Sequence, residues 1–413
     1  MPTRREILQH SAAFAAPDAQ SIPLEKIDVS DPALFREDRI GAYFARLRRE
    51  DPVHYCAESR WGPYWSITKF DDIMQVDTNH AVFSSDSKYG GVSLEDRARR
   101  NFISMDPPRH DEQRRAISPI VAQPNLRNFE ILIRERTADV LDALPVGTEF
   151  DWVSKVSIDL TTKMLATLFG FPYEDRSLLT QWSDISVVTP FETDAARSEA
   201  LQPCFAYFTR LLEQRLQEPP KADLISMLAH SDGTRSMERA EFYGNILLLI
   251  VGGNDTTRNT MSASVLALHE NPNEFDKLCN RQELIPSMVS ETIRWQTPLT
   301  HMRRTAVADV EMRGKRIRRG DKVAMWYLSG NFDEEAIENA DRYIIDRPNV
   351  RRHLSFGFGV HRCVGNRLAE LQLRILWEEM FKRRMRVEVV GAPVRTNSNV
   401  VHGFEALPVR VVQ

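Results

Sequence analysis

The chain has few cysteines, no surplus of positive charge and no long apolar segment. Its four cysteines, Cys56, Cys204, Cys279 and Cys363, lie far apart without a CxxC pair, so the sequence indicates neither a disulfide framework nor a zinc cluster. Lys and Arg total 54 against 58 Asp and Glu, which leaves no positive charge to neutralise the phosphates of a nucleic acid. The longest apolar run, Ile246–Val251, is far shorter than the roughly 20 residues of a membrane-spanning helix. These absences predict a cytoplasmic protein without a nucleic-acid partner or a membrane anchor.

The rest of the composition is that of a globular protein, with 42% hydrophobic and 27% charged residues. Residues 1–20 are small, polar and interrupted by proline, and we expect them to be flexible. No repeat, linker or low-complexity tract divides residues 21–413, so they predict a single domain. Apolar residues at helical spacing dominate residues 107–300, whereas strand patterns occur around Gly62-Pro63, between residues 309 and 327, and near the C-terminus. The predicted fold class is mainly α with a small β region.

The segment FGFGVHRCVG, residues 356–365, places Cys363 among glycines directly before a helical pattern. A lone cysteine is usually a small buried side chain. Here the glycines allow positive φ angles and a close approach of backbone N–H groups to the sulfur, and the following helix would direct its positive end at it. Phe356 would keep water away, and no second ligand pair accompanies His361 and Cys363 for zinc. The pattern favours a protected thiolate of the kind that binds a haem iron.

This segment resembles the haem-binding signature of the cytochrome P-450 superfamily, in which a Phe, a Gly, a basic residue, the Cys and a final Gly recur at this spacing. The resemblance continues over nearly the whole chain. It implies the triangular, mostly helical cytochrome P-450 fold with haem b as cofactor. Cys363 would then be the axial thiolate ligand of the iron. His361 would contact a haem propionate, where many members of the family have an arginine.

In SETIRW, Glu291 and Arg294 are three residues apart and share one helical face. Taken alone, such a pair is typical of a solvated surface ion pair. In the family the pair is buried and joined by a further arginine, and the resemblance gives that place to Arg342 in ADRYIID. The three residues would stabilise the structure rather than take part in catalysis.

In LLLIVGGNDTTRN, two glycines and an Asp-Thr pair interrupt a helical pattern. The residues alone fit a close helix crossing at Gly252 and Gly253, with Asp255 capping a second helix. The family carries an acid and a threonine here, above the distal face of the haem. The resemblance therefore implies two catalytic residues: Thr256 would hydrogen-bond oxygen or a water there, and Asp255 would belong to a proton relay.

In MDPPRHDEQRRAI, His110 and Arg114 are four residues apart on one face of a helix that the prolines could start. Such a pair is often only part of a polar face. The family contacts the haem propionates from this segment, which implies that role for both residues. A third contact would come from HMRRTAVADVE, where the spacing to Asp309 favours Arg304 over Arg303 but leaves both open.

The stretches LLIVGGNDTTRN, MVSETIRWQTPLTHMRRTA, KVAMWYLSGN and HLSFGFGVHRCVGNRLAELQ closely resemble the bacterial alkane hydroxylase branch of the superfamily. The resemblance implies a monooxygenase that inserts one oxygen atom of O2 at the terminal methyl group of medium-chain n-alkanes. Leu248, Val251, Gly252 and Leu299 would line a narrow apolar channel that presents only the chain end. The alternative is a soluble cytochrome P-450 that hydroxylates fatty acids, terpenoids or another apolar small molecule.

The chain also resembles the soluble bacterial class of cytochromes P-450, and this resemblance bears on how electrons are supplied. The resemblance implies that electrons come from NAD(P)H through a ferredoxin reductase and a ferredoxin. Arg352, Arg362 and Arg367 flank the cysteine loop and would form a basic docking surface for the ferredoxin. Ordinary solvation explains these three arginines equally well.

Overall fold

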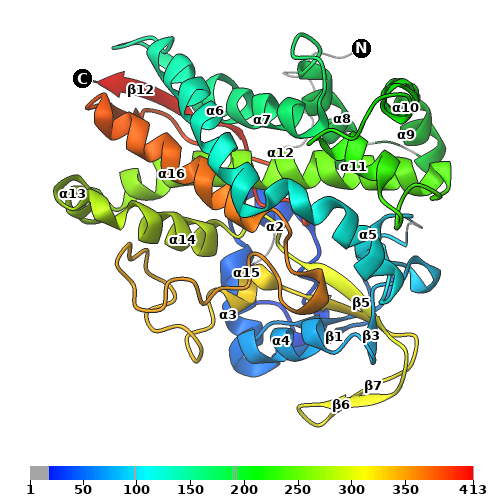
Figure 1. The fold of residues 1–413 in the computed structure, drawn as a ribbon. Coiled ribbons are helices and arrows are strands. Elements are labelled where there is room, and N and C mark those ends of the chain that lie inside the picture. The colour runs from blue at the N-terminus through cyan, green and yellow to red at the C-terminus, as the bar shows by residue number, and fades with distance from the viewer. Residues whose placement is uncertain (1–17, 97–98, 188, 190, 192, 413) are drawn as a thin grey trace.

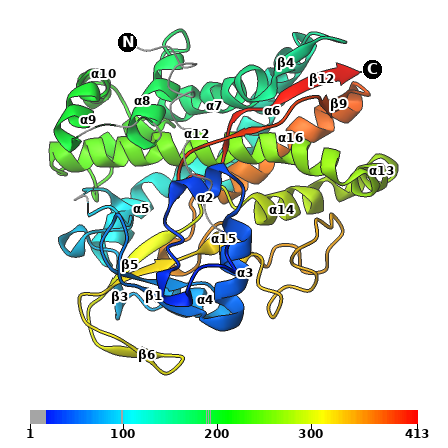
Figure 2. The ribbon, with the colours of Figure 1, turned by 180° about the vertical axis from the view of Figure 1, so that it is seen from behind.

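The computed structural model describes residues 18–96, 99–187, 189, 191 and 193–412, which form a mainly helical fold with small sheets (Figures 1 and 2). The predicted fold class is therefore confirmed. The segment predicted to be flexible, residues 1–20, lies outside the described residues except for 18–20. Ala19 is buried there, and its carbonyl oxygen accepts a hydrogen bond from Arg46 at 2.6 Å. The packed chain thus begins before residue 21.

Helices make up most of the chain between residues 109 and 296, as the apolar periodicity predicts. One helix starts directly after Pro107-Pro108, and another starts just after Cys363, both as expected. The α-helices are α2 (Pro32–Arg36), α3 (Ile40–Glu50), α4 (Phe70–Thr78), α5 (Arg109–Ile117), α6 (Gln123–Asp142), α7 (Asp159–Phe169), α8 (Ser177–Val187), α9 (Asp194–Ala200), α10 (Gln202–Leu216), α11 (Leu224–His230), α12 (Arg239–Glu270), α13 (Pro272–Asn280), α14 (Ile285–Gln296), α15 (Tyr327–Gly330) and α16 (Asn366–Lys382).

Short helical turns connect several of these elements. A π-helical turn, η5, leads directly into α7, and a 3-10 turn, η7, stands just before Cys363. The turns are η1 (Leu24–Lys26), η2 (Ser87–Tyr89), η3 (Phe102–Ser104), η4 (Ser118–Val121), η5 (Val153–Ile158), η6 (Gln282–Leu284) and η7 (Gly359–His361).

The strands form a five-stranded sheet in the order β1-β2-β8-β5-β3, a three-stranded sheet β4-β12-β9, and the pairs β6-β7 and β10-β11. The hairpin predicted around Gly62-Pro63 is β1-β2, in which Val53 lies opposite Ile67. The strands are β1 (Val53–Cys56), β2 (Tyr64–Ile67), β3 (Phe83–Ser84), β4 (Glu149–Asp151), β5 (Met302–Ala306), β6 (Val310–Met312), β7 (Lys315–Ile317), β8 (Lys322–Met325), β9 (Arg386–Val389), β10 (Val394–Arg395), β11 (Phe404–Ala406) and β12 (Pro408–Val412).

The long helix α12 crosses the molecule and takes part in two apolar cores (Figure 1). Its first half packs with α7, α8 and α10, and its last part packs with α14 and α16. It runs unbroken through its glycines, so Asp255 caps no second helix. Gly253 does allow a close crossing, because a Cβ there would lie 2.7 Å from the Leu165 side chain of α7. Among the described residues, none of the helices combines the length and the apolar character needed to cross a membrane.

Candidate active site

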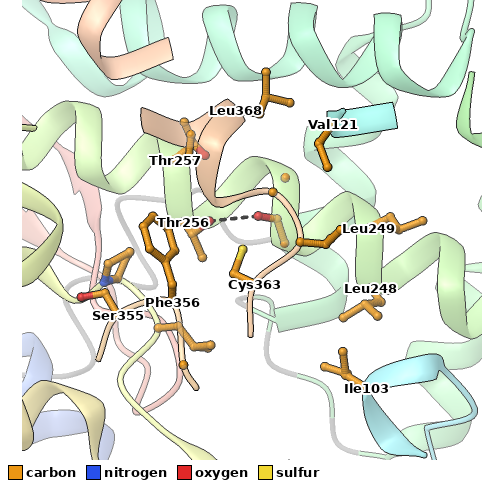
Figure 3. Close-up of a pocket in the computed structure, with 18 of the residues that line it drawn as sticks. Ile103, Val121, Leu248, Leu249, Thr256, Thr257, Ser355, Phe356, Cys363 and Leu368 are labelled. Carbon is orange, nitrogen blue, oxygen red and sulfur yellow. Dashed lines mark hydrogen bonds between the residues drawn. The ribbon is translucent and has the colours of Figure 1, made fainter. Parts of the chain in front are cut away.

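Cys363 lies in the loop between η7 and α16, and its side chain faces a cavity (Figure 3). Its backbone N–H donates to the carbonyl oxygen of Phe356 at 2.8 Å, which closes the loop. The N–H groups of Gly365 and Asn366, at the start of α16, are directed at the sulfur. The positive end of the helix therefore meets the sulfur, as the sequence predicts.

The other two glycines of the loop serve its packing against α4. Gly357 and Gly359 have φ angles of 65° and 64°, a region that favours glycine. A Cβ on Gly359 would lie 2.7 Å from the backbone oxygen of Asp77. The Asp77 carboxylate also accepts a hydrogen bond from the N–H of Phe358 at 2.8 Å. Of the three glycines expected to admit N–H groups to the sulfur, only Gly365 has that place, and the others let the loop lie on α4.

The surroundings of the sulfur act on its protonation in opposite directions. Burial raises the pKa of the Cys363 thiol, whereas the two N–H groups and the charges of Arg114 and Arg362 oppose that rise. A bound metal ion takes the place of the thiol proton. In the described part of the chain, no group of three His, Cys, Asp or Glu side chains could hold a metal ion by itself. A single sulfur ligand is what the axial position of a haem iron requires.

Basic side chains gather on one side of the cavity. Arg114, Arg304 and His361 line it, and His110 packs against His361 with ring centroids 4.2 Å apart. Both ring nitrogens of His361 and Nε2 of His110 are buried without a hydrogen-bond partner among the described residues. Burial lowers the pKa of both imidazoles. Unpaired ring nitrogens beside two guanidinium groups fit the carboxylates of haem propionates.

The alternation of side chains along β5 distinguishes Arg304 from Arg303. Arg304 lines the cavity, where its guanidinium also forms a buried ion pair with Asp77 at 2.7 Å. Arg303 points to the other face of the strand and binds Asp96 at 2.6 Å. Arg304 is therefore the arginine of this pair that faces the cavity.

Thr256 and Asp255 lie on different sides of α12. Thr256 lines the cavity, and its Oγ1 donates to the carbonyl oxygen of Gly252 at 2.9 Å (Figure 3). The Asp255 carboxylate is fully buried away from the cavity, accepts a hydrogen bond from Ser183 at 3.1 Å and lies 2.7 Å from the Arg258 guanidinium. Burial raises the pKa of Asp255, and the Arg258 charge opposes the rise. The structure thus brings the predicted hydroxyl to the cavity but not the predicted acid.

Apolar side chains form most of the remaining wall. Of the predicted lining residues, Leu248, Gly252 and Leu299 line the cavity, but Val251 does not. A helix turns by about 100° per residue, so a face that contains Leu248, Gly252 and Thr256 leaves Val251 beyond its edge. Leu249 lies on this face instead (Figure 3). Three further lining residues, Ile117, Val364 and Leu368, stand in segments recognised by their motifs but were not themselves expected in the cavity. The lining residues from segments without a recognised motif include Ile103, Val121, Leu165 and Leu224.

Glu291 and Arg294 form a fully buried pair, with both carboxylate oxygens 2.8 Å from the guanidinium. The third member is Arg347, whose guanidinium lies 3.2 Å and 3.3 Å from the same two oxygens. The assignment of Arg342 is wrong, because its side chain is exposed and only its carbonyl oxygen accepts hydrogen bonds from the two buried arginines. The chain turns between these positions, where the N–H of Arg347 donates to the carbonyl oxygen of Ile344 at 3.3 Å, and the later arginine returns to the carboxylate.

The three arginines expected to dock a ferredoxin, Arg352, Arg362 and Arg367, are all exposed. The Arg352 guanidinium lies 4.0 Å from the Asp71 carboxylate. The docking surface stays a prediction.

The cavity has a sulfur on one wall, a hydroxyl-bearing helix near it and a basic side, and these features fit haem b. Cys363 would hold the iron, and Phe356 lines the cavity beside the sulfur. His110, Arg114, Arg304 and His361 would hold the propionates.

Comparison with known proteins gives consistent matches over nearly the full length. The profile of the Cytochrome P450 family matches residues 35–396. The structure resembles CYP153D17 from Sphingomonas sp. PAMC 26605, with a TM-score of 0.89, 48% identity and coverage of 95% of this chain and 100% of that chain. It also resembles Cytochrome P450-153 from Novosphingobium aromaticivorans, with a TM-score of 0.88, 47% identity and coverage of 93% and 99%. Linalool 8-monooxygenase of Pseudomonas putida is 34% identical in an alignment of 407 residues that covers 94% of this chain and 100% of that protein.

The family match includes every part of the cavity, from the segment of His110 to the cysteine loop. The family implies haem b as cofactor, O2 as co-substrate and electrons from NAD(P)H through redox partners. The chain belongs to the cytochrome P450 family and is a P450 monooxygenase.

Proposed function

We propose that this monooxygenase hydroxylates the terminal methyl group of medium-chain n-alkanes in the cytoplasm, with electrons supplied by a ferredoxin and its reductase. The main support for this proposal is the apolar wall of the cavity. Leu248, Leu249 and Leu299 face the same space as Cys363, and the cationic lining side chains, Arg114 and Arg304, are those suited to the propionates. A substrate without a charged group therefore suits the cavity best. The resemblance to the alkane hydroxylase branch supports the same substrate class.

Selection of the terminal methyl group has to be geometric, because its C–H bonds are stronger than those of the neighbouring methylenes. When bound, haem supplies the iron at which O2 is activated for insertion into a C–H bond. The leucines of α12 would exclude water and hold the alkane extended, so that only its end reaches the reacting position. This restriction is the contribution of the chain itself to the choice of product.

The Thr256 hydroxyl of α12 would take part in proton supply on the side of the cavity that α12 lines. Thr256 Oγ1, which now donates to Gly252, would hold a water or donate a proton at that place. Asp255 is held behind the helix by Arg258 at 2.7 Å and Ser183 at 3.1 Å, so it would take part in proton supply only if its carboxylate left these partners and turned toward the cavity.

A second candidate substrate class is the terpenoids. The observation that favours it is the 34% identity to linalool 8-monooxygenase over nearly the whole chain. A terpenoid alcohol needs a hydrogen-bond partner, and Thr257 and Thr260 also line the cavity. Fatty acids fit less well, because their carboxylate would compete for the basic side chains suited to the propionates.

The test is product analysis with octane and linalool, with a ferredoxin system as electron donor. We expect 1-octanol as the main octane product and slower turnover of linalool. Leu248→Ala should raise the share of 2- and 3-octanol, because a wider channel lets the chain bend. Val251→Ala is the matched control on the same helix, outside the cavity, and should leave the ratio unchanged. A Leu→Ala change costs about 2–5 kcal/mol in a packed site, so haem content and folding are measured first. Mainly subterminal alcohols from the wild type would contradict the proposal.

A further inference from the structure

Residues 89–96 begin at the end of the turn η2 and contain no helix or strand beyond it. Val92 is 8% exposed and lines the cavity that contains Cys363. Leu94, two residues later, is buried in one of the apolar cores. Because no strand ladder fixes this segment, the position of Val92 depends on individual hydrogen bonds from neighbouring elements.

Arg303 on β5 holds the segment at several points. Its N–H donates to the carbonyl oxygen of Val92 at 2.8 Å. Its guanidinium donates to the carbonyl oxygens of Tyr89 at 3.0 Å and Ser93 at 3.3 Å, and to the Asp96 carboxylate at 2.6 Å. These positions run from the first residue of the segment to the last, so one arginine fixes its whole course.

The guanidinium is itself buried against the segment. Arg303 is 2% exposed and forms its ion pair with Asp96. The Thr305 hydroxyl accepts from the guanidinium at 3.1 Å and donates to the carbonyl oxygen of Tyr89 at 2.9 Å. Lys322 on β8 binds the second oxygen of Asp96. Withdrawal of the segment would deprive a buried cation of its acceptors, which is costly.

The backbone passes so close to the guanidinium that no side chain fits there. Gly90 has a φ angle of 105°, which favours glycine. A Cβ on Gly90 would lie 2.8 Å from one guanidinium nitrogen of Arg303 and closer still to the other. The glycine therefore allows the hydrogen bond that its neighbour Tyr89 accepts.

The Arg303 side chain stays outside the cavity. Successive side chains of a strand point to opposite faces, and on β5 it is Arg304 that lines the cavity. Arg303 can therefore affect a substrate only through the residues that it holds. Val92 lines the same cavity as Leu248 and Leu299, so a displacement of Val92 would change the width of that space.

We propose that Arg303 is a positioning residue for the choice of product: by fastening residues 89–96 it keeps Val92 in the wall of the cavity and the alkane extended. The effect on the product rests on the proposed function, whereas the fastening does not. Lysine could not replace this arginine, because a single ammonium nitrogen lacks the planar fork that reaches several acceptors at once.

Hydrogen exchange followed by mass spectrometry on the haem-loaded protein tests the fastening. The reporter is the N–H of position 303, which is released when Val92 moves away. Arg303→Lys keeps the charge but loses the bonds to two carbonyl oxygens, so exchange there should rise by up to about 30-fold. Peptides from α14 and α16 should exchange as in the wild type, which distinguishes local release from loss of the fold. Arg316→Lys, an exposed arginine on β7 that binds Asp309, is the matched control and should change nothing.

A second variant disturbs the same contact from the side of the segment. Gly90→Ala places a methyl group against the guanidinium and should also speed exchange at position 303. Gly147→Ala is its matched control, because Gly147 has a positive φ of 76° but a Cβ there would meet nothing within 4 Å. This control should leave the exchange rate unchanged.

Product analysis with octane tests the consequence for the substrate. Arg303→Lys and Gly90→Ala should raise the share of 2- and 3-octanol about twofold or more, since one methylene of misfit changes discrimination in an apolar pocket by about 10-fold. The two controls should keep the wild-type ratio. Unchanged exchange at position 303 in Arg303→Lys, or an unchanged product ratio despite faster exchange, overturns the proposal. Mainly subterminal alcohols from the wild type contradict the proposed function alone, because the exchange measurement uses no substrate.

Discussion

Replacing Arg347 should destabilise the protein strongly, whereas replacing Arg342 should not. In the wild type, Arg347 binds both oxygens of the fully buried Glu291 and donates to the carbonyl oxygens of Asn339 at 2.9 Å and Arg342 at 2.7 Å. Arg347→Met keeps most of the side-chain volume but removes the charge and all of these bonds. The buried carboxylate then loses one of its two cationic partners.

The expected loss of stability in Arg347→Met depends on the hydrogen-bond partners that Glu291 keeps. Removing one partner of a buried ion pair costs about 3–5 kcal/mol. Glu291 keeps both bonds to Arg294 at 2.8 Å and one from the N–H of Ile344 at 2.9 Å, so its charge stays partly compensated. We therefore expect the lower end, a loss of about 3 kcal/mol in the free energy of unfolding. Arg342→Met leaves the backbone carbonyl in place. It should change the free energy of unfolding by less than about 0.5 kcal/mol.

Urea unfolding followed by far-UV circular dichroism measures both variants, with haem content recorded in parallel. The expected order of stability is wild type and Arg342→Met together, with Arg347→Met well below them. Equal losses in the two variants, or a loss only in Arg342→Met, would refute the assignment of the third arginine to position 347.

Three further predictions concern the sulfur, the hydroxyl and a buried histidine. Cys363→Ala should abolish the red-shifted carbon monoxide band of a thiolate-ligated haem, whereas alanine at each of the other three cysteines should leave it; a retained band in Cys363→Ala contradicts the ligand assignment. Thr256→Ala should still bind haem and substrate but divert reduced oxygen to peroxide, and unchanged coupling of NAD(P)H use to product would argue against its role in proton supply. Burial lowers the pKa of His301 to about 4, so on acidification the unfolded chain takes up a proton near pH 6.5 before the folded chain does. The free energy of unfolding should therefore fall between pH 6.5 and pH 4, and His301 alone should account for up to about 3 kcal/mol of this loss. Urea midpoints measured across this range should depend less on pH in His301→Gln than in the wild type.

The sequence predicts best where a local pattern is long. The helix after Cys363, the hairpin at Gly62-Pro63 and the mainly helical class all follow from periodicity and turn residues, and the structure confirms them. The cysteine loop is recognisable because its residues are contiguous. The sequence could not show that Gly357 and Gly359 serve contact with α4, because that contact joins distant segments.

The errors have the same physical origin. Arg342 and Arg347 stand in one short segment, and only the turn between them decides which side chain reaches Glu291. Val251 was placed by its spacing from Leu248, but the orientation of α12 toward the cavity is set by the helices packed around it. Such choices depend on tertiary structure, which no local pattern contains.

The contact between Asp77 and the cysteine loop has a consequence for how the protein matures. This one carboxylate accepts hydrogen bonds from Arg304, from the Tyr327 hydroxyl and from the N–H of Phe358, the last across 281 positions of sequence. Contacts between such distant segments form late in folding, because a long stretch of chain has to be ordered first. A growing chain therefore has no assembled sulfur loop until nearly all of it has been synthesised. We therefore expect haem capture to follow synthesis of the chain instead of accompanying it.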